Sequence, residues 1–162
     1  MVATNTADAV DRLTAWLTST GDGLPTLVVP GMWDTVSAYW PRSPYQKRRT
    51  VYVLRHAIRQ HRFGAQRVMH SYPFRLVLWW PLLAGNGSAE ADQRAFDVAI
   101  DALLQRMLAY LGDKSLGGRF LSSGEGDTLS EVQFDPAEHT IPQLGGLRAE
   151  ASFFADDPEI FA

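Results

Sequence analysis

The sequence predicts an α+β fold, a mostly antiparallel sheet with a long hairpin, packed by one long and one short helix. Three observations predict this class. Residues 88–112 repeat apolar side chains every three or four positions, the spacing of an amphipathic helix. Residues 67–80 and 147–155 alternate in the manner of strands. The predicted strands also lack regular βαβ alternation, which favours an antiparallel sheet with helices on one side.

The long helix is predicted from Ser88 to Gly112, because start and stop signals flank its apolar stripe. The Ser88 hydroxyl can accept a hydrogen bond from a first-turn N–H, and glycine commonly ends helices. Glu90 and Asp92 suit the positive end of the helix dipole. The stripe that we expect to be buried consists of Phe96, Ala99, Ile100, Leu103, Met107, Tyr110 and Leu111.

The same periodicities predict the other elements. A short helix is expected at Asn5–Leu17, and strands are expected at Thr26–Val29, Thr50–Ile58, Arg67–Trp80, Leu129–Asp135 and Leu147–Ala155. The second and third strands form the hairpin, with a polar turn at Gln60–Ala65 and a basic tip. Pro73 predicts an edge position or a bulge. We expect one domain over residues 1–162, with a flexible loop at 112–128 and an acidic tail at 156–162.

The stretch Trp33–Tyr45 is predicted to be a loop with at most one helical turn, because Pro41 and Pro44 interrupt any regular element. Two interpretations of its aromatic side chains stay open. They pack onto their own core, or they form a contact surface for another chain, since Trp, Tyr and Arg are enriched at interfaces. The candidate interface aromatics are Trp33, Tyr39, Trp40 and Tyr45.

The charges are distributed unevenly along the chain. The net charge is −3, yet residues 35–89 contain nine bases and no acid, while the rest carries six bases and all 18 acids. Such segments pair inside one fold, meet between copies in an oligomer, or present a basic face to a polyanion. The candidate oligomer or DNA-channel contacts are Arg42, Lys47, Arg48, Arg49, Arg55, Arg59, Arg62 and Arg67.

No motif predicts catalysis, a metal or a cofactor. The chain has no cysteine, and its four histidines lack the spacing of a metal site. Residues 85–88 lack the lysine of a phosphate loop, and no serine lies in a nucleophile elbow. Asp97 and Asp101 share a helix face, where solvated carboxylates are commoner than acid–base pairs. We therefore expect a protein that is not an enzyme.

No segment predicts a membrane protein. Residues 1–10 lack the basic and apolar regions of a signal peptide. The longest apolar run, Leu76–Ala84, is too short to span a bilayer. The expectation is a soluble protein without a membrane partner.

The order of elements resembles that of the tail terminator proteins of long-tailed bacteriophages. The resemblance covers nearly the whole chain and is one of pattern. It is carried by the opening helix at Asp8–Leu17, the strand pair reaching the YPFRLVLWWP run (Tyr72–Pro81), the helix at Glu90–Leu111, the Gly/Ser loop and the closing strand at Leu147–Ala155. Trp33–Tyr45 departs from the pattern, being longer and more aromatic.

The resemblance implies a virion protein of the head–tail junction, assembled in the host cytoplasm. It implies a homohexameric ring that caps the tail tube, ends its polymerisation and joins it to the neck. The implied partners are the major tail protein, a neck or connector protein, and genomic DNA passing through the channel without sequence recognition. Two alternatives remain, namely another head–tail joining protein and a non-specific nucleic-acid-binding module.

Overall fold

The structure, a computed structural model, describes residues 6–20, 26–28, 32–62, 67–82, 88–108, 122–123, 132–134, 145–156 and 160–161. The helices are α1 (Thr6–Thr18) and α2 (Ala89–Leu108). The strands are β1 (Thr35–Ala38), β2 (Thr50–Arg55), β3 (Arg59–Arg62), β4 (Arg67–Pro81), β5 (Ser122–Ser123), β6 (Val132–Phe134), β7 (Gly146–Asp156) and β8 (Ile160–Phe161).

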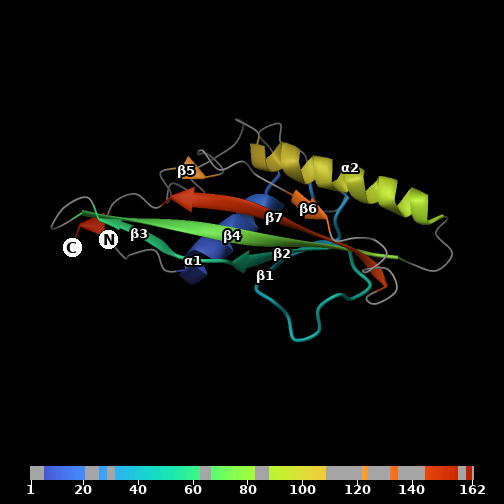
Figure 1. The fold of residues 1–162 in the computed structure, drawn as a ribbon, viewed down its shortest axis with the longest axis horizontal. Helices are drawn as coiled ribbons and strands as arrows, with labels where there is room; N and C mark the ends of the chain where they lie inside the picture. Colours follow the sequence, from blue (N-terminus) through green and yellow to red (C-terminus); the bar gives the residue numbers. More distant parts are fainter. Residues whose placement is uncertain are drawn as a thin grey trace.

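The described strands form one sheet (Figure 1). Its main order is β1-β2-β4-β7-β5, while β3 and β8 also pair with β4 and β6 pairs with β7. The β1–β2 pair is parallel and the other pairs are antiparallel. The predicted fold class is therefore confirmed: a mostly antiparallel sheet carries the long β2/β3–β4 hairpin and packs against one long and one short helix.

β4 is the central strand of the sheet. It pairs with β2 and β3 on one side and with β7 over Ser71–Pro81 on the other. Pro73 is not at an edge, but the predicted bulge is present. The register moves by one residue between the Arg55–Phe74 and Arg59–Ser71 pairs, so the first arm of the hairpin has one extra residue opposite Pro73. The carbonyl oxygen of Pro73 accepts hydrogen bonds from the N–H groups of His56 and Ala57 at 3.1 and 3.4 Å. A proline is tolerated there because its missing N–H faces the interruption between β2 and β3.

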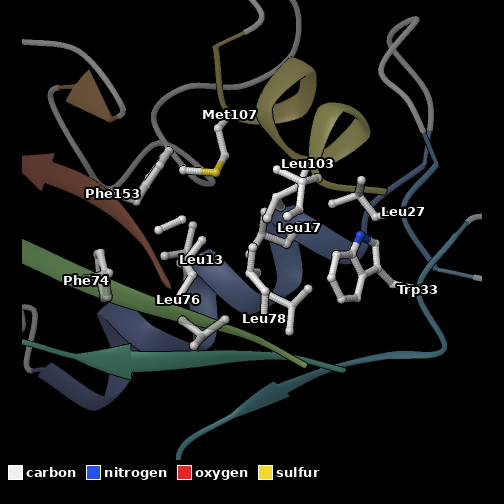
Figure 2. Packing of buried hydrophobic residues seen from close by; sticks show 14 of the residues in the cluster. Leu13, Leu17, Leu27, Trp33, Phe74, Leu76, Leu78, Leu103, Met107 and Phe153 are labelled. Atoms are coloured by element: carbon white, nitrogen blue, oxygen red, sulfur yellow. The ribbon is translucent and has the colours of Figure 1, made fainter. Parts of the chain in front are cut away.

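Both helices bury their apolar stripes on one face of the sheet (Figure 2). Figure 2 shows Leu13 and Leu17 of α1 next to Leu76 and Leu78 of β4, with Leu103 on α2 above them. The predicted alternation of β4 and β7 is confirmed, because Tyr72, Phe74, Leu76, Leu78, Trp80, Leu147, Ala149, Ala151 and Phe153 all join this core. The described stripe of α2 is buried as predicted, and each large side chain contributes about 1.5–3 kcal/mol.

The start of α2 agrees with the predicted cap. The N–H of Ala91 donates to the Ser88 hydroxyl at 3.2 Å, and the N–H of Asp92 donates to the Ser88 carbonyl at 3.2 Å. The predicted end at Gly112, together with Tyr110 and Leu111, lies outside the described residues.

The opposite face of the sheet, called here the open face, has a smaller apolar cluster of its own. Tyr52, Val77 and Trp79 form it, and Trp79 is 1% exposed. The strand β7 begins at Gly146 under the Trp79 ring, where a Cβ would lie 2.5 Å from a ring carbon. That distance is shorter than any ordinary carbon–carbon contact, so only glycine fits under this tryptophan without a shift.

Several predicted irregular segments contain strands, which corrects the sequence analysis. Part of the Trp33–Tyr45 loop is β1, and part of the Gln60–Ala65 turn is β3. Conversely, the described part of the predicted strand at Thr26–Val29, residues 26–28, forms an isolated bridge from Val28 to Trp33 instead of a strand. These short segments have weak local patterns, so pairing with a neighbouring strand decides their conformation.

Two more corrections fall near the C-terminus. Of the predicted flexible loop at 112–128, the structure describes Ser122–Ser123, which pair with β7 as β5. Within the predicted acidic tail at 156–162, Ile160–Phe161 pair with β4 as β8. The predicted strand at Leu129–Asp135 is confirmed in its described part, Val132–Phe134. The tip of the hairpin, residues 63–66, lies outside the described residues.

Candidate interaction surface

Residues 39–49, called here the basic loop, join β1 to β2 along one edge of the sheet (Figure 1). Because β1 and β2 are parallel, with Thr35 opposite Thr50, the chain must return along the length of β1 before β2 begins. Tyr39 and Tyr45 make this reversal possible with positive φ angles of 67° and 60°. Such angles are uncommon for residues other than glycine.

Aromatic contacts fasten the basic loop to the open face. The Tyr45 ring lies 4.8 Å from the Trp79 ring, and the Trp40 ring lies 5.0 Å from the Tyr52 ring. Trp79 Nε1 donates to the Gln46 carbonyl oxygen at 2.7 Å. These contacts hold the middle of the loop against the sheet, although Trp40 stays 41% exposed.

The basic loop carries four bases and no acid. Arg42, Lys47 and Arg48 are exposed, and within the described residues their side chains form no ion pair. Arg49 differs, because its guanidinium carbon lies 4.4 Å from the centre of the Trp80 ring. The backbone N–H of Arg49 also donates to an Asp34 carboxylate oxygen at 2.8 Å. Arg49 therefore supports the loop, while the other three cations face solvent.

The remaining candidate cations lie elsewhere along the hairpin. Arg55, at the end of β2, has its guanidinium 5.8 Å from the centre of the Tyr39 ring. Arg59 and Arg62 are exposed on β3. The backbone of Arg67 starts β4, and its side chain lies outside the described part. The candidate cations thus divide between the basic loop, which carries Arg42, Lys47, Arg48 and Arg49, and the strands of the hairpin, which carry the other four.

Trp33 corrects the set of candidate interface aromatics. Its side chain is 0% exposed, its Nε1 donates to the Ala99 carbonyl oxygen at 3.2 Å, and its ring meets that of Trp80 edge-on. It is a core residue that joins the segment before β1 to α2. Of the four aromatics, Trp40 is the exposed one, while Tyr39 and Tyr45 are half-buried.

An ion network that the sequence analysis did not find crosses the open face from β4 to β7. Arg75 Nε donates to a Glu150 carboxylate oxygen at 2.8 Å, Arg148 donates to the other oxygen at 2.5 Å, and Arg148 Nε donates to the Tyr45 hydroxyl at 3.0 Å. The hydrogen bond from Arg75 is the largest cause that lowers the pKa of Glu150, against burial, which raises it. The network ties the basic loop to β7.

One sequence signal for this covered face existed. Leu76–Trp80 is continuously apolar, which is typical of a strand buried on both faces, whereas alternation alone places Val77 and Trp79 in solvent. The pairing of Arg75 with Glu150 had no local signal, because the two residues are 75 positions apart.

Among the described residues, two polar hollows border the open face. One, of about 170 Å³, lies between β1, β2 and the basic loop and is lined by Thr35, Ser37, Pro41, Ser43, Gln46, Arg48, Thr50 and Tyr52. The other, of about 130 Å³, is lined by His56, Phe74, Arg75, Gln133, Glu150, Ala151 and Ser152. Its carboxylate is already held by two arginines, so it offers no free base.

α2 lies on the other side of β7 from the basic loop (Figure 1), and its exposed side carries more acids than bases. Asp97 and Asp101 share this side with Val98, which is 51% exposed, and with Arg94, which is paired with Glu90. Within the part of the chain that the structure describes, neither aspartate forms an ion pair. We call Asp97, Val98 and Asp101 the acidic helix face.

Within the described segments, no group of three His, Cys, Asp or Glu residues is placed to hold a metal ion. His70 contacts the Gln60 side chain at 2.9 Å, whereas His139 lies outside the described residues. No described helix has the length and apolar character needed to cross a membrane.

Comparison of the chain with protein-family models and with curated proteins finds no match.

Proposed function

We propose that this protein is a tail terminator of a long-tailed bacteriophage, a structural ring that caps the tail tube, ends its polymerisation and joins it to the neck. The order of elements supports the proposal, as described above. The observation that carries it is the exposed, unpaired set Arg42, Lys47 and Arg48, because these cations are not neutralised by the chain's own described acids. Such a surface suits contacts with other chains or with DNA.

The test adds the purified chain to tail tubes of the same phage and to its polymerising major tail protein. The expected result is a ring at one end of each tube by electron microscopy and an arrest of tube growth. Tubes that grow at the same rate, with bare ends, would contradict the proposal. Binding to the isolated connector rather than to tubes would instead identify a neck protein.

A non-specific nucleic-acid-binding module is the second candidate. Trp40 is exposed in the same loop as Arg42, Lys47 and Arg48, and a loop with an exposed aromatic ring and cations suits stacked bases and phosphates. For this function, binding to single-stranded DNA should weaken steeply with salt. Lys47→Ala with Arg48→Ala should reduce the slope of log K against log salt by about 1–2. Binding that is insensitive to salt would exclude this candidate.

A further inference from the structure

We infer that the basic loop binds the acidic helix face of a second copy of this chain, head to tail. The contact would pair Trp40, Arg42, Lys47 and Arg48 of one copy with Asp97, Val98 and Asp101 of the next. The inference deepens the proposed function. The contact between two copies is argued from the two surfaces, and only its closure into a ring rests on the proposed function.

The positions of the two surfaces determine the kind of contact. The basic loop follows β1 at one edge of the sheet, and α2 packs beside β7 towards the other edge (Figure 1). Two different surfaces on opposite sides of one subunit make a heterologous contact, in which each copy uses both surfaces. A contact of this type closes into a ring when its rotation allows it, and otherwise continues as a filament.

The two surfaces are complementary in charge and similar in construction. Each has one exposed apolar side chain and unpaired charges of a single sign. Trp40, 41% exposed, belongs to the loop that carries three exposed cations. Val98, 51% exposed, shares its helix side with Asp97 and Asp101, while Arg94 on that side is paired with Glu90. Interfaces combine an apolar centre with a polar rim, and tryptophan and arginine are enriched in them. Opposite charges across the contact would also fix its orientation.

The acidic helix face favours a second copy over DNA as the partner of the basic loop. Asp97 and Asp101 have no cation partner among the described residues, so two unmatched surfaces of opposite sign exist on the same chain. A head-to-tail contact between copies gives both charged surfaces a partner of opposite sign. DNA bound to the basic loop would leave Asp97 and Asp101 without one.

The experiment measures self-association of the full chain by sedimentation velocity at about 50 mM salt, where surface charges are weakly screened. The loop variant combines Lys47→Glu with Arg48→Glu, and the helix variant combines Asp97→Lys with Asp101→Lys. Circular dichroism checks that each variant keeps the fold, as expected for exposed positions. The matched controls are Arg59→Glu on β3 and Asp11→Lys on α1, which reverse exposed charges outside both surfaces.

Each double variant alone should raise the dissociation constant by about 100-fold or more, because like charges then face each other. An equimolar mixture of the two variants should restore association to within about tenfold, because every contact again joins opposite charges. Carrying all four substitutions in one chain should restore it equally. The controls should change the dissociation constant by less than about threefold.

Three results would overturn the inference: no self-association of the unmodified chain, association that survives both double variants, or loss that the mixture does not restore. DNA binding that is lost in the loop variant and not recovered in the fourfold variant would assign the basic loop to nucleic acid instead. The tail-tube assay separates the two proposals. If rings form on tubes but self-association does not respond to the double variants, this interface is refuted and the proposed function is not. If the mixture of variants restores self-association but the chain does not bind tubes, the proposed function is refuted and this interface is not.

Discussion

Trp33 and Trp40 lie close together in the sequence, but the fold gives them different surroundings. Trp33 is fully buried between Trp80 and Phe96, whereas Trp40 leans on Tyr52 and keeps 41% of its surface in solvent. The difference comes from the chain path, since Trp33 precedes β1 on the helix side and Trp40 follows it on the open face.

Replacing each of these two tryptophans by phenylalanine should change the free energy of unfolding by different amounts. Trp33→Phe should lower the free energy of unfolding by about 1–3 kcal/mol, because it leaves a gap in the core and removes the hydrogen bond to Ala99. Trp40→Phe should stay within about 0.5 kcal/mol, because the ring is partly solvated. Urea unfolding measures both. A larger loss for Trp40→Phe would show that Trp40 supports the core.

Glu150 makes stability depend on pH in a defined direction. Its carboxylate accepts from Arg75 and Arg148, so its pKa in the folded chain is lowered. A lowered carboxyl pKa adds stability above the unfolded-state pKa of about 4.3, and this stability is lost as pH falls through the folded pKa. The network should therefore stabilise the fold at neutral pH, and this stabilisation should be lost in acid as Glu150 becomes protonated.

Glu150→Gln tests that direction. The variant should be less stable than the unmodified chain by about 1 kcal/mol at pH 7, an amount kept small by partial exposure, and the difference should shrink at about pH 3. Urea titrations at the two pH values measure it. Glu90→Gln, which changes an exposed pair with Arg94 on α2, is the control and should differ little at either pH. A difference that grows in acid would refute the assignment.

At the scale of elements, local periodicity was a good guide to long helices and strands and a poor one to short pieces. The boundaries of α1 and the described part of α2 agree with the caps and stripes in the sequence. β1 and β3 have four residues each, which is too few for a pattern to show. Their hydrogen bonds to β2 and β4 determine them, so sequence reasoning assigned these residues to a loop and a turn.

The two helices are joined by a buried arginine. Arg106 of α2 is 0% exposed, donates to the Trp16 carbonyl oxygen at the end of α1 at 2.6 Å, and also donates to the Ser19 hydroxyl. Its guanidinium lies 5.3 Å from the centre of the Trp16 ring. It thereby adds a charged donor to a carbonyl in the last turn of α1, which also accepts from the backbone N–H and the hydroxyl of Ser19.

Arg106→Met should lower the free energy of unfolding by about 1–3 kcal/mol, because methionine keeps the apolar stem but cannot donate to Trp16 or Ser19. Chemical denaturation followed by circular dichroism measures it. The matched control on the same helix is Arg94→Met, which is 77% exposed and should cost less than about 0.5 kcal/mol. Equal effects would mean that the buried hydrogen bonds contribute nothing net.

At the scale of the whole molecule, the sheet depends on partners that are far apart in the sequence. β4 takes its second neighbour from β7, near the other end of the chain, along a ladder from Ser71–Asp156 to Pro81–Gly146. β7 also supplies Leu147, Ala149, Ala151 and Phe153 to the core that α1 and α2 cover. The fold should therefore form as a unit that includes residues 145–156.

Truncation tests this dependence. A fragment of residues 1–144 should show no cooperative thermal unfolding, because β4 loses a full ladder and the core loses part of its wall. A fragment of residues 1–156, which lacks β8 but keeps β7, should still unfold cooperatively. Circular dichroism melts compare both with the full chain. Cooperative unfolding of the shorter fragment would contradict a core that needs β7.

By itself, the sequence determined the fold class, the long helix, the long strands and the concentration of bases in one segment. These features follow from apolar periodicity and composition, which are local properties of the chain. The tertiary structure decided which aromatics are core, which acids and bases meet, and where the basic loop lies. Those outcomes depend on the parallel β1–β2 pairing and on the β4–β7 ladder, both of which join residues whose partners no local pattern specifies.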